Sequence, residues 1–317
     1  MQDFTGTEDS RGDLPFSMYN AFCSTPYAGS AGAVVLNASE VPRAQRVRIA
    51  REIGAPATAF VSAIKSAEVE VQFFSTVMEL PMCGHGTMCL VTSLVDAGLL
   101  PAPGTGRREI TLSLPKGSAT VAYHQTREGR VEVMLDVTPA RYTSAELDLE
   151  ELAGLLGARV SDVPDTMPIL VASADFIHLC LPFHDLDAIG RLNPSFPELA
   201  AFCRRNGIET VATFTLDTID PAADLHVRDF CPAVGVAESA AAGTTNAALA
   251  GYLMQVGLTP PVSPGCWTIR AEQGIEIGRP SQITTLIDAE NGVINRIRVG
   301  GVASRVLSGH INPRNMV

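Results

Sequence analysis

Lysine is nearly absent from this chain of 317 residues, which contains only Lys65 and Lys116. A pyridoxal enzyme holds its cofactor on a lysine, so that class of enzyme is disfavoured. Acidic residues outnumber basic ones by 34 to 23, and nothing in the sequence resembles a basic face, which argues against a nucleic-acid partner. The seven cysteines are scattered and form no CxxC pair, as expected in a reducing cytoplasm.

A long hydrophobic run is missing as well. The segment Met1 to Asp13 is polar and acidic, so we expect a loose extension there, neither a secretory signal nor a membrane span. The chain as a whole is long enough to bury a large core, and we expect it to form two lobes.

One short motif occurs twice. The first copy is Cys83-Gly84-His85-Gly86-Thr87, and the second is Ala242-Gly243-Thr244-Thr245-Asn246. In both copies a small residue and a glycine precede apolar residues at helical spacing, and a further glycine closes the run. Each copy therefore predicts a helix, and the two helices begin at equivalent positions.

A helix start leaves backbone N–H groups unpaired and carries partial positive charge. Two starts that face one another would hold a small carboxylate or an enolate-like anion between them. The first copy offers Cys83 and His85, whereas the second offers Ala242 and Thr244. The sequence thus predicts a symmetrically built cleft that carries its reactive thiol on one side only.

The rest of the chain shows many short strands and few helices. Helical spacing predicts helices over 42–53, 147–156 and 196–205. Alternation predicts strands over 57–64, 69–75, 109–114, 119–123, 131–137, 167–172, 176–181, 210–216 and 225–230. The tail is expected to form short strands broken by glycines, over 267–270, 276–278, 283–287, 293–299 and 303–307. This pattern indicates an α+β protein with curled sheets and a crossing between lobes near 139–144.

Several segments together resemble the PhzF-like isomerases of phenazine biosynthesis, which are related to diaminopimelate epimerase and proline racemase. The segments, in chain order, are 33–36, 49–52, 58–61, 79–87, 228–232, 273–274, 278–281 and 299–301. The similarity runs from about Phe16 to Ile311, nearly the whole chain. The Cys-Gly-His-Gly-Thr form of the first motif is similar to that of proline racemases.

This resemblance implies two pseudo-symmetric lobes, each a curled, barrel-like mixed β-sheet around a central helix, with the site between the helix starts. The N-terminal lobe would span 14–138 with a return strand over about 298–311, and the C-terminal lobe would span 139–297. The resemblance also implies proton transfer at carbon without a cofactor, a small carboxylate substrate and a homodimer.

The sequence departs from the family's pattern at three polar positions. The glutamate that is the family's characteristic acid/base corresponds to Ala57, the aspartate of the second motif to Ser239, and the asparagine of a Gly-Asn turn to Ser30. We therefore do not expect the glutamate-centred chemistry of the family to operate unchanged.

Cys83 is the first candidate for the acid/base. A thiol at a helix start can have its pKa lowered from about 8.5 into a range of roughly 3.5–7.5, and it can then take a proton from a carbon beside a carboxyl or imine group. His85 is expected to assist, although it could instead cap the helix. Glu238 is a possible second acid/base, but both it and its equivalent Glu79 could simply stabilise a helix start.

The residues expected to bind substrate are Gly84, Gly86, Thr87, Ser239, Gly243, Thr244, Thr245 and Ser30.

Other functions are weighed against this one. A two-thiol racemase is disfavoured because Ala242 cannot carry a proton. A cysteine hydrolase would lack an orienting third group, and a metal site of Cys83, His85 and Cys89 would lack a fourth ligand. We expect a shift of a proton and a double bond in a small unsaturated or imine carboxylic acid derived from an amino acid, in specialised, antibiotic-type metabolism. An amino-acid epimerase and an inactive binding or scaffold descendant stay open.

Overall fold

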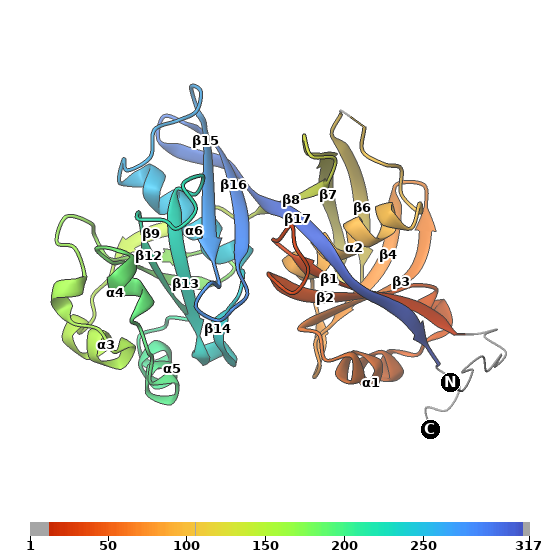
Figure 1. Cartoon of the computed structure of the whole chain (residues 1–317), viewed down its shortest axis with the longest axis horizontal. Helices are drawn as coiled ribbons and strands as arrows, with labels where there is room; N and C mark the ends of the chain where they lie inside the picture. The colour runs from red at the N-terminus through yellow and green to blue at the C-terminus, as the bar shows by residue number, and fades with distance from the viewer. Residues whose placement is uncertain (1–12, 105, 313–317) are drawn as a thin grey trace, which may run out of the picture.

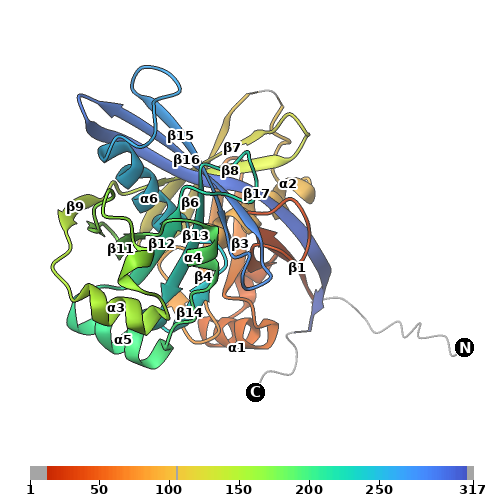
Figure 2. The ribbon, with the colours of Figure 1, turned by 60° about the vertical axis from the view of Figure 1, so that its left-hand side comes forward.

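Two lobes lie side by side in the computed structural model, which describes residues 13–312 apart from residue 105 (Figure 1). The loose extension expected over 1–13 lies outside the described residues except for Asp13. The long strand β17 (Val293–Ile311) runs from one lobe into the other (Figures 1 and 2). Within the part of the chain that is described, no helix is long and apolar enough to cross a membrane.

Eight strands close into a barrel in the N-terminal lobe. Following the ring, β17 pairs with β1, and the pairing continues through β2, β3, β4, β6, β7 and β8 back to β17. The bounds are β1 (Leu14–Ala21), β2 (Ser30–Val35), β3 (Ala57–Lys65), β4 (Glu68–Phe74), β6 (Arg108–Leu114), β7 (Gly117–Gln125) and β8 (Val131–Val137). The short β5 (Glu79–Leu80) pairs with β4, and η1 (Ala38–Glu40) and α1 (Arg43–Ile53) follow β2. The helix α2 (Gly84–Asp96) fills the barrel, and every residue from Gly86 to Leu94 is buried.

The C-terminal lobe has a similar arrangement of strands, but within the described residues strand pairing does not close its sheet into a ring. Its strands are β9 (Arg141–Ser144), β10 (Leu170–Ser173), β11 (Ile177–Pro182), β12 (Thr210–Thr215), β13 (Leu225–Cys231), β14 (Val236–Ser239), β15 (Cys266–Gln273) and β16 (Ser281–Glu290). β11 lies parallel to β12 and β13 parallel to β15, as β2 lies parallel to β3 and β4 to β6. The helix α6 (Gly243–Gln255) is buried from Thr245 to Leu253. The outer helices, gathered on one side in Figure 2, are α3 (Leu149–Leu156), α4 (Leu186–Gly190) and α5 (Phe196–Arg205), with η2 (Val160–Asp162) and η3 (Pro232–Val234).

The two central helices match residue for residue. Each has 13 residues, and each begins after an extended residue with no side-chain cap, Cys83 in α2 and Ala242 in α6. Two residues after the end of each helix lies a glycine with positive φ, Gly98 at 70° and Gly257 at 73°, a conformation that most other residues would adopt only with strain. The predicted fold class, α+β with a curled sheet around a central helix in each lobe, is confirmed.

The tail differs from the prediction in two places. Residues 276–278 lie in a turn and not in a strand, and the expected strands over 293–299 and 303–307 are parts of the single strand β17. Gly300 does not interrupt the strand. A Cβ there would lie 1.9 Å from the carbonyl oxygen of Val133 and 2.6 Å from the sulfur of Met134. The glycine is thus needed because β8 passes too close for a side chain.

Candidate active site

The starts of α2 and α6 are brought together by β8 and β17. Leu135 of β8 lies directly opposite Val299 of β17 in the antiparallel register. A Cβ on Gly84 would lie 3.6 Å from Leu135, and one on Gly243 would lie 3.4 Å from Val299. Opposed residues on neighbouring antiparallel strands are only about 5 Å apart. The unpaired N–H groups at the two helix starts therefore lie near one another, where the lobes meet.

Cys83 and His85 lie together at the start of α2. The Cys83 sulfur is 3.4 Å from Nδ1 and 3.6 Å from Nε2 of His85, and both residues are partly exposed. Burial works against a thiolate here. It is outweighed by the charge and hydrogen bond of His85 and by nearby N–H groups, which lower the pKa of Cys83 from its ordinary value. For His85, burial is likewise outweighed by Cys83, whose charge and hydrogen bond raise the imidazole pKa. The two opposite shifts favour a thiolate–imidazolium pair.

The remaining residues of the first motif differ in their exposure. Gly84 is exposed, whereas Gly86 is buried, and a Cβ on Gly86 would lie 3.2 Å from that of Ala57. Ala57, at the position of the family's glutamate, is itself fully buried at the start of β3. Thr87 is fully buried, so its hydroxyl is not exposed at the helix start.

At the second motif, Gly243 and Thr244 are partly exposed, as are Ser239 in β14 and Ser30 at the start of β2. Thr245 is buried, and its hydroxyl donates to a carboxylate oxygen of Asp229 at 2.9 Å. Thr245 therefore presents no free hydroxyl to the cleft.

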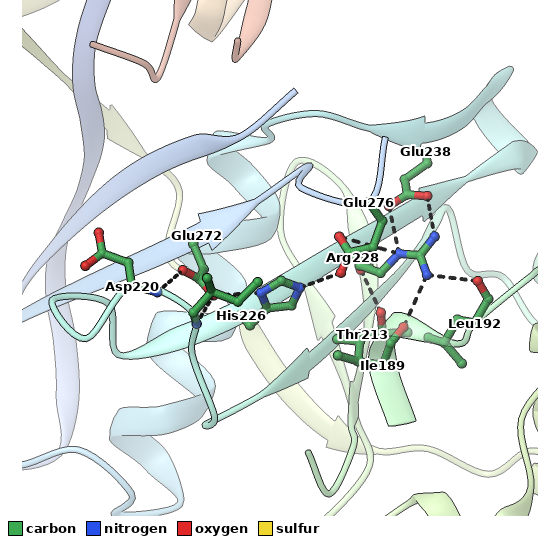
Figure 3. Close-up of polar contacts among 10 residues, drawn as sticks. Ile189, Leu192, Thr213, Asp220, His226, Arg228, Glu238, Glu272 and Glu276 are labelled. Carbon is green, nitrogen blue, oxygen red and sulfur yellow. Dashed lines mark hydrogen bonds and ion pairs between the residues drawn. The ribbon is translucent and has the colours of Figure 1, made fainter. Parts of the chain in front are cut away.

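The two glutamates at equivalent positions are both paired with arginine. Glu238 receives two hydrogen bonds from Arg228, from Nε at 2.9 Å and from Nη2 at 2.8 Å. The side chains of both residues are less than a tenth exposed, and Nη1 of Arg228 donates to the carbonyls of Ile189 and Leu192, as Figure 3 shows. Glu79 pairs instead with Arg43, whose side chain is 72% exposed. An acid/base role for Glu238 would require the buried ion pair to open.

Buried polar residues support the start of α6: Asn246 belongs to the second motif, whereas Gln273 and Asp229 lie outside both motifs. The side-chain amide of Asn246 donates to Gln273 at 2.8 Å and to the carbonyl of Ala242 at 2.9 Å. Gln273 is fully buried and donates to the carbonyl of Ser239 at 2.8 Å. Asp229 is also buried, and burial raises its pKa to about 6. Asp229 and Gln273 lie in the segments 228–232 and 273–274 that resemble the family, but the sequence does not reveal their hydrogen-bond partners.

Comparison with known proteins identifies the family. The model of the PhzC-PhzF family, described as phenazine biosynthesis-like protein, matches residues 19–309. The chain belongs to this family. It is 26% identical over 289 residues to "Uncharacterized isomerase YfhB" of Bacillus subtilis, covering 90% of this chain and 94% of that protein. It is 27% identical over 287 residues to the trans-2,3-dihydro-3-hydroxyanthranilate isomerase of Pseudomonas fluorescens, covering 90% of this chain and 95% of that protein.

A solved structure shows the same fold. The PhzF-family phenazine biosynthesis protein of Bacillus anthracis is similar with a TM-score of 0.85 and 23% identity, over 95% of this chain and 99% of that chain. The predicted family and the predicted class of enzyme, an isomerase, are thereby confirmed. Neither the substrate nor the roles of individual residues follow from these similarities.

Proposed function

We propose that this isomerase moves a proton, and with it a double bond, within a small unsaturated or imine carboxylic acid, using Cys83 as the acid/base. The observation that carries the proposal is the placement of Cys83. Its thiol has a lowered pKa, lies beside His85, and is partly exposed where two helix starts meet. In this position a thiolate base and an anion-binding surface serve the same ligand.

The substrate carboxylate is held by N–H groups that follow Cys83 and Ala242. The Cys83 thiolate takes a proton from a carbon conjugated with the carboxyl group, so the C–H bond breaks and an S–H bond forms. The electron pair moves into the conjugated system as an enolate-like anion, which the same N–H groups stabilise. The thiol of Cys83 then gives its proton to a second carbon of the same molecule. Alternatively, the imidazolium of His85 protonates that carbon and takes the proton of the Cys83 thiol afterwards, which restores the thiolate–imidazolium pair. No oxidant, reductant or cofactor enters this balance.

The placements above divide the expected site residues into two groups. Gly84, Gly243 and Thr244 are accessible at the helix starts and are assigned to substrate binding, together with the partly exposed Ser30 and Ser239. Gly86, Thr87 and Thr245 are buried and are assigned to the packing and support of the helices. Glu238 is assigned to the ion pair with Arg228, and His85 takes the place of a second acid/base.

The use of one thiol favours isomerisation over racemisation. A racemase that works with two bases needs an acid/base on each face of the carbon, and the position opposite Cys83 is Ala242. A 1,3-type proton shift on one face needs a single shuttle. A role in specialised, antibiotic-type metabolism is part of the proposal, and the relative from Pseudomonas fluorescens supplies one candidate substrate, trans-2,3-dihydro-3-hydroxyanthranilate.

The test is deuterium incorporation from heavy water into a panel of unsaturated and imine carboxylates that includes this compound, followed by NMR and mass spectrometry. Wild type is compared with Cys83→Ser and with Cys266→Ser, which removes the other partly exposed cysteine. We expect incorporation at carbon with wild type and Cys266→Ser and its loss with Cys83→Ser. Undiminished turnover by Cys83→Ser would exclude Cys83 as the acid/base. Binding of a panel member without exchange in wild type would instead support the scaffold alternative.

A further inference from the structure

A row of charged side chains connects β13 with the turn between β15 and β16 (Figure 3). In order they are Glu238, Arg228, Glu276, His226 and Glu272. Arg228 lies between Glu238 and Glu276, with its Nε 4.0 Å from Glu276 Oε2. His226 follows and has no exposed side-chain surface. The proposed reaction uses none of these side chains, so their burial calls for another explanation.

His226 is held by a carboxylate at each ring nitrogen. Nδ1 lies 2.7 Å from Glu272 Oε1, and Nε2 lies 2.8 Å from Glu276 Oε1. A neutral imidazole has one N–H group and one lone pair, so it can donate to only one of the two carboxylates. An imidazolium donates to both. The geometry therefore requires a proton either on the second ring nitrogen or on one of the carboxyl groups.

The carboxyl groups are poor sites for that proton. Glu272 also accepts the backbone N–H groups of Ile219 at 2.7 Å and Asp220 at 2.8 Å. For Glu276, burial is outweighed by the hydrogen bond and charge of His226 and by Arg228, which keep the carboxyl pKa lowered. For His226, burial is outweighed by its two carboxylates, which raise the imidazole pKa. The proton thus belongs on His226.

Among the described residues, the charges that act most strongly on His226 are those of Glu276 and Glu272. Asp220 approaches through its backbone, while its carboxylate accepts from Gln282 and from the N–H group of Ala222. The neighbouring strand β12 places Thr215 opposite His226. Arg228 and Glu238 compensate each other one step further along the row.

Glu276 lies in residues 274–281, which we call the interlobe strap. The guanidinium of Arg279 donates to the carbonyls of Gly29 at 2.9 Å and Ala28 at 3.1 Å in the N-terminal lobe. The N–H group of Gly29 donates back to the carbonyl of Pro280 at 3.2 Å. Ser281 donates to the carbonyl of Ala240, shortly before α6, at 2.7 Å. The strap therefore links the loop that leads to β2 with the segment that leads to α6.

We propose that His226 is a positioning residue whose imidazolium, clamped between Glu272 and Glu276, fixes the interlobe strap and so the separation of the two helix starts. When the imidazolium loses its proton, Glu272 keeps two backbone donors, so Glu276 is the partner that is released. The strap then loosens at its middle. This inference concerns the joint between the lobes and does not depend on the proposed reaction.

The test measures the proton and the strap separately. Two-bond ¹H–¹⁵N correlation spectra report whether both nitrogens of His226 are protonated, and hydrogen exchange followed by mass spectrometry reports on peptides over 274–282 and 22–30, corrected for intrinsic rates. Wild type is compared with Glu276→Gln, which keeps the shape of the side chain and removes its charge, and with His226→Gln. The control His124→Gln removes a histidine that pairs with Glu132 on a 40% exposed surface site.

We expect an imidazolium at His226 at neutral pH, and strap exchange that accelerates as pH rises through its raised pKa. Glu276→Gln should speed strap exchange by about tenfold at neutral pH, as the loss of a charged hydrogen bond implies, and should abolish the pH dependence. His226→Gln should act in the same way, and His124→Gln should change neither. A neutral His226 at pH 7, or strap exchange in Glu276→Gln equal to that of wild type, would overturn the proposal.

Discussion

The two helix starts have the same backbone conformation, but different side chains surround them. Both helices have 13 residues and follow an extended residue without a side-chain cap. The first start is supported by apolar contacts, with Gly86 against Ala57 and Phe73. The second is supported by buried polar groups, with Asn246 bonded to Gln273 and Thr245 to Asp229. The two halves therefore have the same backbone geometry but different side-chain chemistry.

This difference assigns distinct tasks to the two halves. The start of α2 carries the thiol and imidazole that can exchange protons with a ligand, and the layer beneath it contributes packing. The start of α6 carries no titratable side chain of its own, and hydrogen bonds beneath it hold its backbone in place. In the proposed function, the first half is therefore the reactive side and the second is the anion-binding side.

The largest expected effect comes from moving the thiol to the other half. In a chain with Cys83→Ala and Ala242→Cys, Thr244 stands where His85 stands in the first motif, so the new thiol lacks the imidazole that helps to lower the pKa of Cys83. Solvent deuterium exchange into substrate should fall by roughly 10²–10⁴-fold, the usual contribution of a positioned acid/base. A rate of deuterium exchange equal to that of wild type would show that the thiol works equally well at either helix start.

The equivalent glutamates offer a comparison of stability. Glu238→Ala removes one partner of a buried ion pair and should lower the free energy of unfolding by about 3–5 kcal/mol. Glu79→Ala breaks a pair with the largely exposed Arg43 and should cost only about 0–1 kcal/mol. Urea denaturation followed by circular dichroism measures both. Equal losses in the free energy of unfolding would contradict this distinction between a buried and an exposed ion pair.

A smaller contrast is expected one turn into the helices, at the equivalent residues Thr87 and Asn246. Asn246→Ala removes two buried hydrogen bonds, to Gln273 and to the carbonyl of Ala242, and should cost about 1–3 kcal/mol. Within the described residues the hydroxyl of Thr87 has no hydrogen-bond partner. Thr87→Val should therefore be neutral or slightly stabilising in the same denaturation experiment. A loss at Thr87 as large as that at Asn246 would contradict the division between apolar and polar support.

The sequence predicted the features that depend on local pattern. The glycine-led helix starts, the helix Phe196–Arg205 and the strands over 109–114 and 131–137 follow from spacing within a few residues, and the structure contains them. Features that depend on how distant segments meet were not predictable. The glycine at 300 was interpreted as a break, because the close approach of β8 is invisible in the sequence.

In the candidate site, too, local contacts could be predicted from the sequence, whereas contacts between distant segments could not. The side chains of Cys83 and His85 are neighbours because they are two residues apart at one helix start. The partner of Glu238 could not be named, because Arg228 reaches it through the register of β13 with β14. Thr87 and Thr245 were predicted to bind substrate, and the structure shows both residues buried, which the sequence did not reveal. Which face of a buried helix points outward is decided by the surrounding sheet.

The pH dependence of the reaction should reflect the pair and not a single residue. Activity should rise as Cys83 loses its proton, at a pH below the ordinary range of a thiol, and should fall as His85 loses its proton, at a pH above the ordinary range of histidine. The profile of kcat/KM against pH is therefore expected to be bell-shaped. A rise that begins only near the ordinary thiol pKa would show that the pair is not formed.

The most direct measurement is the rate at which Cys83 is alkylated by iodoacetamide as a function of pH, followed by mass spectrometry of its peptide. Cys266, the other partly exposed thiol, serves as an internal reference in the same sample. We predict that Cys83 titrates below the ordinary pKa of a thiol and that His85→Gln raises this value. An ordinary or raised pKa for Cys83, or one that His85→Gln leaves unchanged, would contradict the central claim that this half of the cleft carries an activated thiolate.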